Sequence, residues 1–186
     1  MSFRGFISAD IRPNERLAGI LNDLIASRAD IKVVKPGLLH LTLKFLGQTE
    51  DDLVQEIARR IGVAASGIGP FTISLKGMGA FPSLSNIRVV WVGIENGEPL
   101  VRIARNLETS MAELGFKQEN RGFVPHLTVA RMRSGRNMGN VQELIKSNAA
   151  SEFGEYLVDR INLKKSVLGP QGPTYSTVFE FKLSGS

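Results

Sequence analysis

The chain contains two histidines, and each begins the same pattern of histidine, any residue, threonine, any residue. The two copies are His40-Leu41-Thr42-Leu43 and His126-Leu127-Thr128-Val129. Alternation of polar and apolar residues is typical of a half-buried β-strand, in which residues i and i+2 project from the same face. Each motif therefore predicts a histidine and a threonine on one face of a strand, with the aliphatic residues turned into the core.

Two imidazoles and two hydroxyls that meet in one cleft would form an acid–base apparatus. Histidine has an unperturbed pKa of about 6.5, so near neutral pH one imidazole can be neutral while another is protonated. Hydrolysis of a cyclic phosphodiester needs a base to activate water and an acid to protonate the leaving oxygen, each typically contributing about 10²–10⁴-fold. Threonine hydroxyls can donate hydrogen bonds to the phosphate oxygens. We expect His40, His126, Thr42 and Thr128 to act together in catalysis.

Four further side chains are candidates for substrate binding. Arg131 carries a forked guanidinium that suits phosphate, but simple alternation places it on the face opposite His126, so it reaches the phosphate only if the strand bulges or ends first. Lys44 shares a face with His40 by the same alternation, and either lines the cleft or is solvated. For Phe45 we favour a core position over a platform for a base. Tyr175 either packs or stacks on the nucleotide.

The composition narrows the class of protein. A length of 186 residues with 42% hydrophobic and 22% charged residues suits one compact domain or two closely associated lobes. The absence of cysteine excludes disulfides and thiolate metal sites. No apolar run approaches the roughly 20 residues that span a bilayer, and no secretory signal is visible, so we expect a cytoplasmic protein with no membrane partner. A net charge of +5 favours a polyanionic partner such as nucleic acid.

Strands and helices alternate along the chain in an order that positions the two motifs. Strands are predicted over residues 3–9, 31–34, 39–46, 71–75, 87–94, 123–132, 156–164 and 175–183. Helices are predicted from 12–15 to about 28, from an N-cap at Thr49 to about 65, over 100–114 and over 141–147. The order strand, helix, strand, strand, helix occurs roughly twice, and the second motif begins 86 residues after the first (126 − 40). We expect one bilobal domain over 1–186 that arose by internal duplication.

The residues around the motifs resemble the two-histidine (2H) phosphoesterase family, in the branch of the RNA 2′,3′-cyclic phosphodiesterases and 2′-5′ RNA ligases. The resemblance covers essentially the whole chain. It rests on His40-Leu41-Thr42-Leu43-Lys44-Phe45-Leu46-Gly47, on Pro125-His126-Leu127-Thr128-Val129-Ala130-Arg131, and on Ser166-Val167-Leu168 followed by Gly172-Pro173-Thr174-Tyr175. The fold that we expect is α+β, with two pseudo-symmetric lobes, each an antiparallel sheet with helices on its outer face, and an active-site groove between them.

The resemblance also implies a reaction. An RNA or oligonucleotide with a 2′,3′-cyclic phosphate end would be opened to a 2′-phosphomonoester without metal or cofactor, and the reverse reaction would give ATP-independent 2′-5′ ligation. In this mapping His40 is the proton donor to the leaving 3′ oxygen, His126 is the proton acceptor, and Thr42, Thr128 and Arg131 hold the phosphate. We expect a monomer to suffice. Two alternatives stay open: a small cyclic nucleotide or other cyclic phosphate as substrate, and a non-catalytic RNA-binding module whose histidines only grip phosphate.

Overall fold

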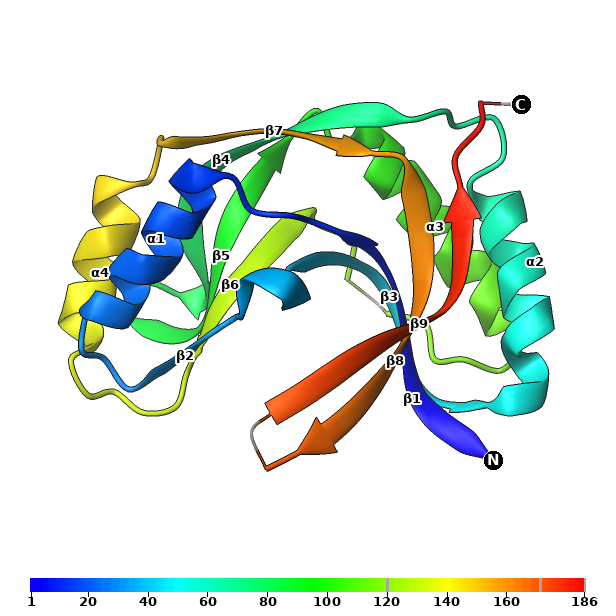
Figure 1. The fold of residues 1–186 in the computed structure, drawn as a ribbon, viewed down its shortest axis with the longest axis horizontal. Helices are drawn as coiled ribbons and strands as arrows, with labels where there is room; N and C mark the ends of the chain where they lie inside the picture. The colour runs from blue at the N-terminus through cyan, green and yellow to red at the C-terminus, as the bar shows by residue number, and fades with distance from the viewer. Residues whose placement is uncertain (120, 171, 186) are drawn as a thin grey trace.

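The computed structural model describes residues 1–119, 121–170 and 172–185. These residues form two antiparallel sheets (Figure 1). The strand order of the four-stranded sheet is β3 (His40–Glu50), β1 (Ser2–Asp10), β8 (Arg160–Gly169) and β9 (Gly172–Lys182). The five-stranded sheet has the order β2 (Ile31–Val33), β6 (His126–Met132), β5 (Asn86–Glu95), β4 (Phe71–Ser83) and β7 (Glu152–Val158).

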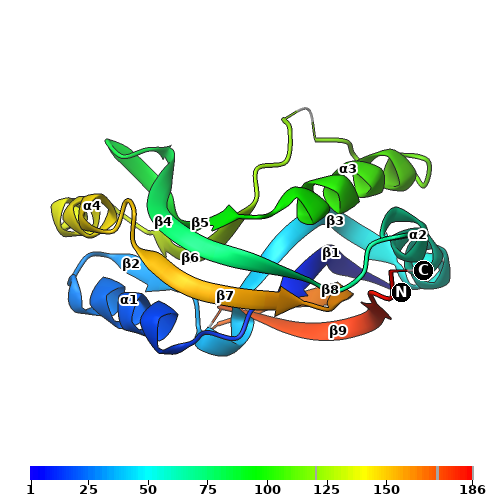
Figure 2. The ribbon, with the colours of Figure 1, turned by 90° about the horizontal axis from the view of Figure 1, so that it is seen from above.

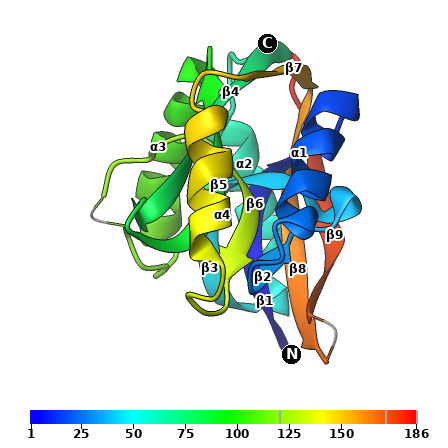
Figure 3. The ribbon, with the colours of Figure 1, turned by 90° about the vertical axis from the view of Figure 1, so that its left-hand side faces the viewer.

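Each sheet is covered by a pair of helices. Helices α1 (Glu15–Ala26) and α4 (Met138–Ser147) lie side by side on the five-stranded sheet, and α2 (Val54–Ala64) and α3 (Glu98–Ala112) lie on the four-stranded sheet (Figures 1 and 3). The apolar stripe of each helix recurs every three to four residues, as in Leu17, Ile20, Leu21 and Leu24 of α1, and it is buried against the sheet. The predicted α+β fold of antiparallel sheets with covering helices is confirmed.

The chain crosses between the sheets, so that neither sheet is built from one half of the sequence. Helix α1 follows β1 of the four-stranded sheet but packs on β2 and β7, and α3 follows β5 of the five-stranded sheet but packs on β3. Strand β7 leads into β8 of the other sheet through the single residue Asp159. The single predicted strand over 156–164 is therefore wrong, since it spans the end of one sheet and the start of the other.

Three other predicted boundaries are corrected by the strands that the structure shows. Thr49 is not an N-cap: it pairs with Phe3, is fully buried, and donates from Oγ1 to the Gly47 carbonyl, so β3 continues to Glu50. A short 3-10 turn, Asp51–Leu53, then leads into α2. Strand β4 runs to Ser83 and not to residue 75, because the glycine-rich stretch between the predicted strands over 71–75 and 87–94 pairs with β5. The predicted strand over 123–132 begins only at His126.

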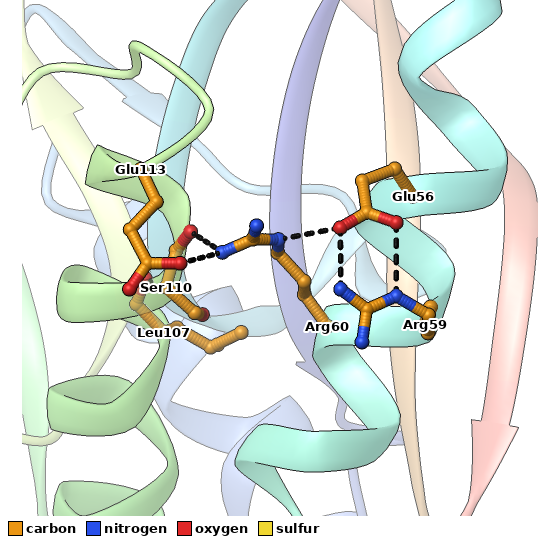
Figure 4. Close-up of polar contacts among 6 residues, drawn as sticks. All are labelled: Glu56, Arg59, Arg60, Leu107, Ser110 and Glu113. Atoms are coloured by element: carbon orange, nitrogen blue, oxygen red, sulfur yellow. Dashed lines mark hydrogen bonds and ion pairs between the residues drawn. The ribbon is translucent and has the colours of Figure 1, made fainter.

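Helices α2 and α3 are joined by a cluster of ion pairs at their surface (Figure 4). The carboxylate of Glu56 accepts hydrogen bonds from Arg59 and Arg60, and Arg60 also donates to the Ser110 carbonyl and to Glu113 of the region after α3. Hydrogen bonds from the two guanidinium groups lower the pKa of Glu56 to about 2. Glu56 thereby helps to orient Arg60, whose contacts with the Ser110 carbonyl and with Glu113 join the two helices.

Among the described helices, none is both long enough and apolar enough to cross a membrane.

Candidate active site

The two motifs lie on neighbouring strands of different sheets. Strand β3 is the edge strand of the four-stranded sheet, β6 lies next to the edge of the five-stranded sheet, and the two strands contact each other (Figures 1 and 2). On both strands the aliphatic residues of the motif are buried, while the histidine and the threonine are partly exposed. We call the side of the sheets that carries His40, Thr42, His126 and Thr128 the motif face.

Both imidazoles are held in the same way. Nδ1 of His40 lies 2.7 Å from the Leu38 carbonyl oxygen, and Nδ1 of His126 lies 2.8 Å from the Val124 carbonyl oxygen. A carbonyl only accepts hydrogen bonds, so Nδ1 is the protonated nitrogen in each neutral ring. Nε2 is consequently the atom that gains or loses a proton on each histidine. This shared arrangement suits a pair of groups of which one donates and the other accepts a proton.

His40 sits among aromatic rings of its own sheet. Its ring centroid is 4.9 Å from that of Phe6 and 5.2 Å from that of Tyr175, and the Tyr175 ring stands edge-on to it at 89°. Burial lowers the pKa of His40, the hydrogen bond to the Leu38 carbonyl and the charge of Asp10 raise it, and the charges of Lys164 and Arg131 lower it. Burial is the largest of these effects.

His126 rests on a separate aromatic stack. Its ring centroid is 5.1 Å from that of Phe81, which lies 5.4 Å from that of Trp91, the single tryptophan of the chain. Trp91 in turn pairs with Gly79 of β4, where any side chain would overlap the indole ring. Gly79 thus leaves the space that the indole ring occupies. The indole ring packs against Phe81, and Phe81 packs against the imidazole of His126.

Each motif strand bulges at the third residue after its histidine. Ser8 pairs with Thr42 while Ile7 pairs with Lys44, which leaves Leu43 as an extra residue. In β6, Trp91 pairs with Thr128 while Val90 pairs with Ala130, which leaves the valine between them unpaired. A bulge of one residue reverses the alternation of the side chains that follow it, up to the next irregularity in the strand.

The bulge in β6 brings Arg131 to the motif face. Arg131 is exposed, and its charge acts on both His40 and Tyr175 of the other sheet. The condition that sequence reasoning set for Arg131, a bulge before it, is met. The guanidinium therefore lies where it can contribute positive charge beside His40 and Tyr175.

The equivalent bulge in β3 corrects two expectations. Lys44 does not line the cleft and is not solvated: it is 2% exposed and turned toward α3, where Nζ donates to Glu108 at 2.9 Å and to the Lys117 carbonyl at 2.6 Å. Phe45 is not a core residue, since it is 58% exposed. Reversed alternation buries the residue at position 44 and returns the next one to the side of His40. Phe45 in β3 thereby takes the place that Arg131 has in β6.

Several residues of the site were missed by sequence reasoning. Phe6, Phe81 and Trp91 support the imidazoles, and Asp10 lies directly opposite His40 in the pairing of β1 with β3. None of them lies near a motif in sequence. The single tryptophan on an alternating strand is the one signal that could have indicated a special position. Within residues 1–119, 121–170 and 172–185, no group of three or more His, Asp or Glu side chains is placed to hold a metal ion.

Comparisons with known proteins identify the family. The family model described as "2'-5' RNA ligase superfamily" matches residues 22–169. An RNA 2',3'-cyclic phosphodiesterase of Methanothermobacter thermautotrophicus is 37% identical over 98% of this chain and 100% of its own length. One of Methanocaldococcus jannaschii is 38% identical over 81% of this chain and 84% of its own.

Solved structures share the fold. A Thermus thermophilus protein superposes with a TM-score of 0.77 at 27% identity, covering 97% of both chains. E. coli LigT in complex with 3'-AMP superposes with a TM-score of 0.72 at 24% identity, covering 98% of this chain and 99% of its own. Together with the two histidine motifs, these matches show that the chain belongs to the 2'-5' RNA ligase superfamily of two-histidine phosphoesterases, as a member of its RNA 2',3'-cyclic phosphodiesterase family.

Proposed function

We propose that this protein hydrolyses the 2′,3′-cyclic phosphate at an RNA 3′ end and leaves a 2′-phosphomonoester. The observation that carries the proposal is the matched pair of imidazoles, each with Nδ1 tied to a carbonyl and Nε2 left for proton transfer. Relatives that are more than 30% identical over most of the chain bear the name RNA 2',3'-cyclic phosphodiesterase, which supports the choice of substrate.

In the proposed reaction His126 is the base and His40 is the acid. Nε2 of His126 takes a proton from water as the water oxygen bonds to phosphorus. The bond between phosphorus and the 3′ oxygen breaks, and protonated Nε2 of His40 delivers its proton to that oxygen. A lowered pKa makes the protonated His40 imidazole a stronger acid, and the negative phosphate favours that protonated form on binding.

Neutral and charged donors on the motif face stabilise the phosphate. The hydroxyls of Thr42 and Thr128 donate to its oxygens as charge develops, and Arg131 adds a guanidinium. Tyr175 and exposed Phe45 supply aromatic surface for the nucleoside. The same steps with an RNA 5′-hydroxyl in place of water, which loses its proton to His126 as the 3′ oxygen leaves, give 2′-5′ ligation without ATP. The scheme uses no metal and no cofactor.

The test is turnover of an oligonucleotide that ends in a 2′,3′-cyclic phosphate, in the presence of EDTA. We expect a 2′-phosphate product and a loss of about 10²–10⁴-fold in kcat for His40→Ala and for His126→Ala. A 3′-phosphate product would mean that the other ribose oxygen leaves. Faster turnover of a mononucleoside cyclic phosphate would identify a small cyclic substrate instead, and binding of the oligonucleotide without turnover would leave only an RNA-binding module.

A further inference from the structure

A cluster of polar and charged side chains on the motif face lies beside His40 and has no part in the reaction described above. Asp10 pairs with His40 in the β1–β3 ladder. The Asp10 carboxylate accepts a hydrogen bond from Nζ of Lys164 at 2.6 Å and one from Nδ2 of Asn162 at 3.1 Å, both from β8. The cluster thus links the neighbouring strand to the position opposite the imidazole.

The cluster is firmly placed. The Lys164 side chain is 13% exposed, and Asn162 is buried beside Ser8, with which it pairs across the β1–β8 ladder. A lysine that is largely removed from water and bonded to one carboxylate loses most of its freedom to move. The positions of both charges relative to His40 are therefore fixed by the sheet rather than by flexible side chains.

Building on the proposed function, we infer that Asp10 and Lys164, anchored by Asn162, form a positioning pair whose opposed charges set the protonation state in which His40 serves as the acid. Asp10 stabilises the imidazolium and Lys164 disfavours it. Among the described residues, the other ionisable groups that act on or contact His40 are Arg131 from β6, whose charge also disfavours the imidazolium, and Tyr175 from β9, whose pKa is raised by burial. Asp10 is thus the anion that offsets two cations at this imidazole.

An electrostatic role and a merely structural role make different predictions. If the ion pair only tied β1 to β8, removal of either partner would have the same effect. If the pair acts on His40, Asp10→Asn moves the titration of His40 to lower pH and Lys164→Met moves it to higher pH. The double variant then lies between the two. These opposite directions are the signature of the proposal.

The experiment is an NMR titration of the free protein, in which the two histidines are the only imidazole signals and His126 serves as the internal reference. Glu180→Gln is the matched control, because it removes a carboxylate from the same sheet whose ion-pair partner is Arg160 rather than Lys164. We expect opposite shifts of His40 in Asp10→Asn and Lys164→Met, with His126 unmoved. Shifts in one direction, or no shift in either folded variant, would overturn the inference.

Kinetics provide a second readout. The limb of the kcat/KM profile that reports the acid should move with His40 in both variants, with up to about a tenfold change in rate for each pH unit on that limb. If wild-type protein fails to turn over the cyclic phosphate, the proposed function fails while the NMR titration still tests the positioning pair. If turnover is normal and the opposite shifts are absent, only the positioning pair is refuted.

Discussion

Replacing Lys44 by methionine separates a structural role from a role in substrate binding. The lysine lies on a motif strand four residues after His40, yet its side chain is turned away from the motif face and into the contact between β3 and α3. Methionine has a similar length and no charge. It leaves the Glu108 carboxylate without its cation and the Lys117 carbonyl without a donor.

The expected loss of stability follows from the burial of the pair. Removing one partner of a buried ion pair costs about 3–5 kcal/mol, because the other charge stays desolvated. Glu108 is 24% exposed and keeps a hydrogen bond from the Glu119 amide, which places the loss near the lower limit, about 3 kcal/mol. For a chain of this length, that corresponds to a fall in Tm of roughly 6–12 °C.

Thermal unfolding followed by far-UV circular dichroism measures the effect. The double variant Lys44→Met, Glu108→Leu should recover most of the lost Tm, because no unpaired charge then remains buried. At a temperature where every variant is folded, kcat/KM for the cyclic phosphate should equal that of the wild type. An unchanged Tm together with a raised KM would refute this reasoning and would indicate that Lys44 binds the substrate.

Four other outcomes are expected. Gly79→Ala displaces the Trp91 ring that packs against Phe81, so the fluorescence of the single tryptophan should change and kcat/KM should fall. The control Gly19→Ala in α1, where a Cβ would meet no other group within 4 Å, should alter neither quantity and should raise Tm slightly. Arg131→Met should lower kcat/KM by about 10²–10³-fold and raise the pKa of His40 in an NMR titration; a normal rate would exclude contact with the phosphate. The pKa of Glu56 is about 2 in the folded protein and 4.5 ordinarily, so its ion pairs stabilise the fold at pH values above 4.5 and are lost as the pH falls toward 2. The Tm difference between wild type and Glu56→Gln should therefore be largest at neutral pH and vanish near pH 2. A Tm difference that does not depend on pH would contradict the pairing. Replacing the leaving 3′ oxygen of the substrate by sulfur, which departs without a proton, should restore turnover in His40→Ala but not in His126→Ala, and the reverse pattern would exchange acid and base.

Local pattern was enough to predict most of the strands and helices. The alternation of His40 with Thr42 and the apolar stripe of α1 each depend on neighbours in sequence, and both agree with the structure. The strand break at Asp159 and the place of Thr49 within β3 were predicted wrongly, because pairing partners far away in the chain decide where a strand ends. Such pairing is not encoded in any short window of residues.

In the candidate site, too, some residues could be predicted from local pattern, while the places of others depend on pairing with distant strands. The periodicity of the sequence was enough to predict the motif residues. Their repetition suggested an internal duplication, which stays a prediction and is supported by the matching bulges and carbonyl contacts. The bulges themselves, and hence the places of Lys44 and Phe45, depend on the number of residues that the partner strand supplies. Asp10 could not be found, since it reaches His40 only through the β1–β3 ladder.

The paired bulges have a consequence for how a substrate can lie. Strands with the same motif and the same irregularity would by themselves accept a cyclic phosphate equally well in either direction. The fifth residue after each histidine removes that equivalence, because one strand presents a cation, Arg131, and the other a phenyl ring, Phe45. A nucleotide turned end for end would bring its charge to the ring and its base to the guanidinium. Under the proposed function, two strands with the same motif thus give the substrate a single polarity through one pair of unlike side chains.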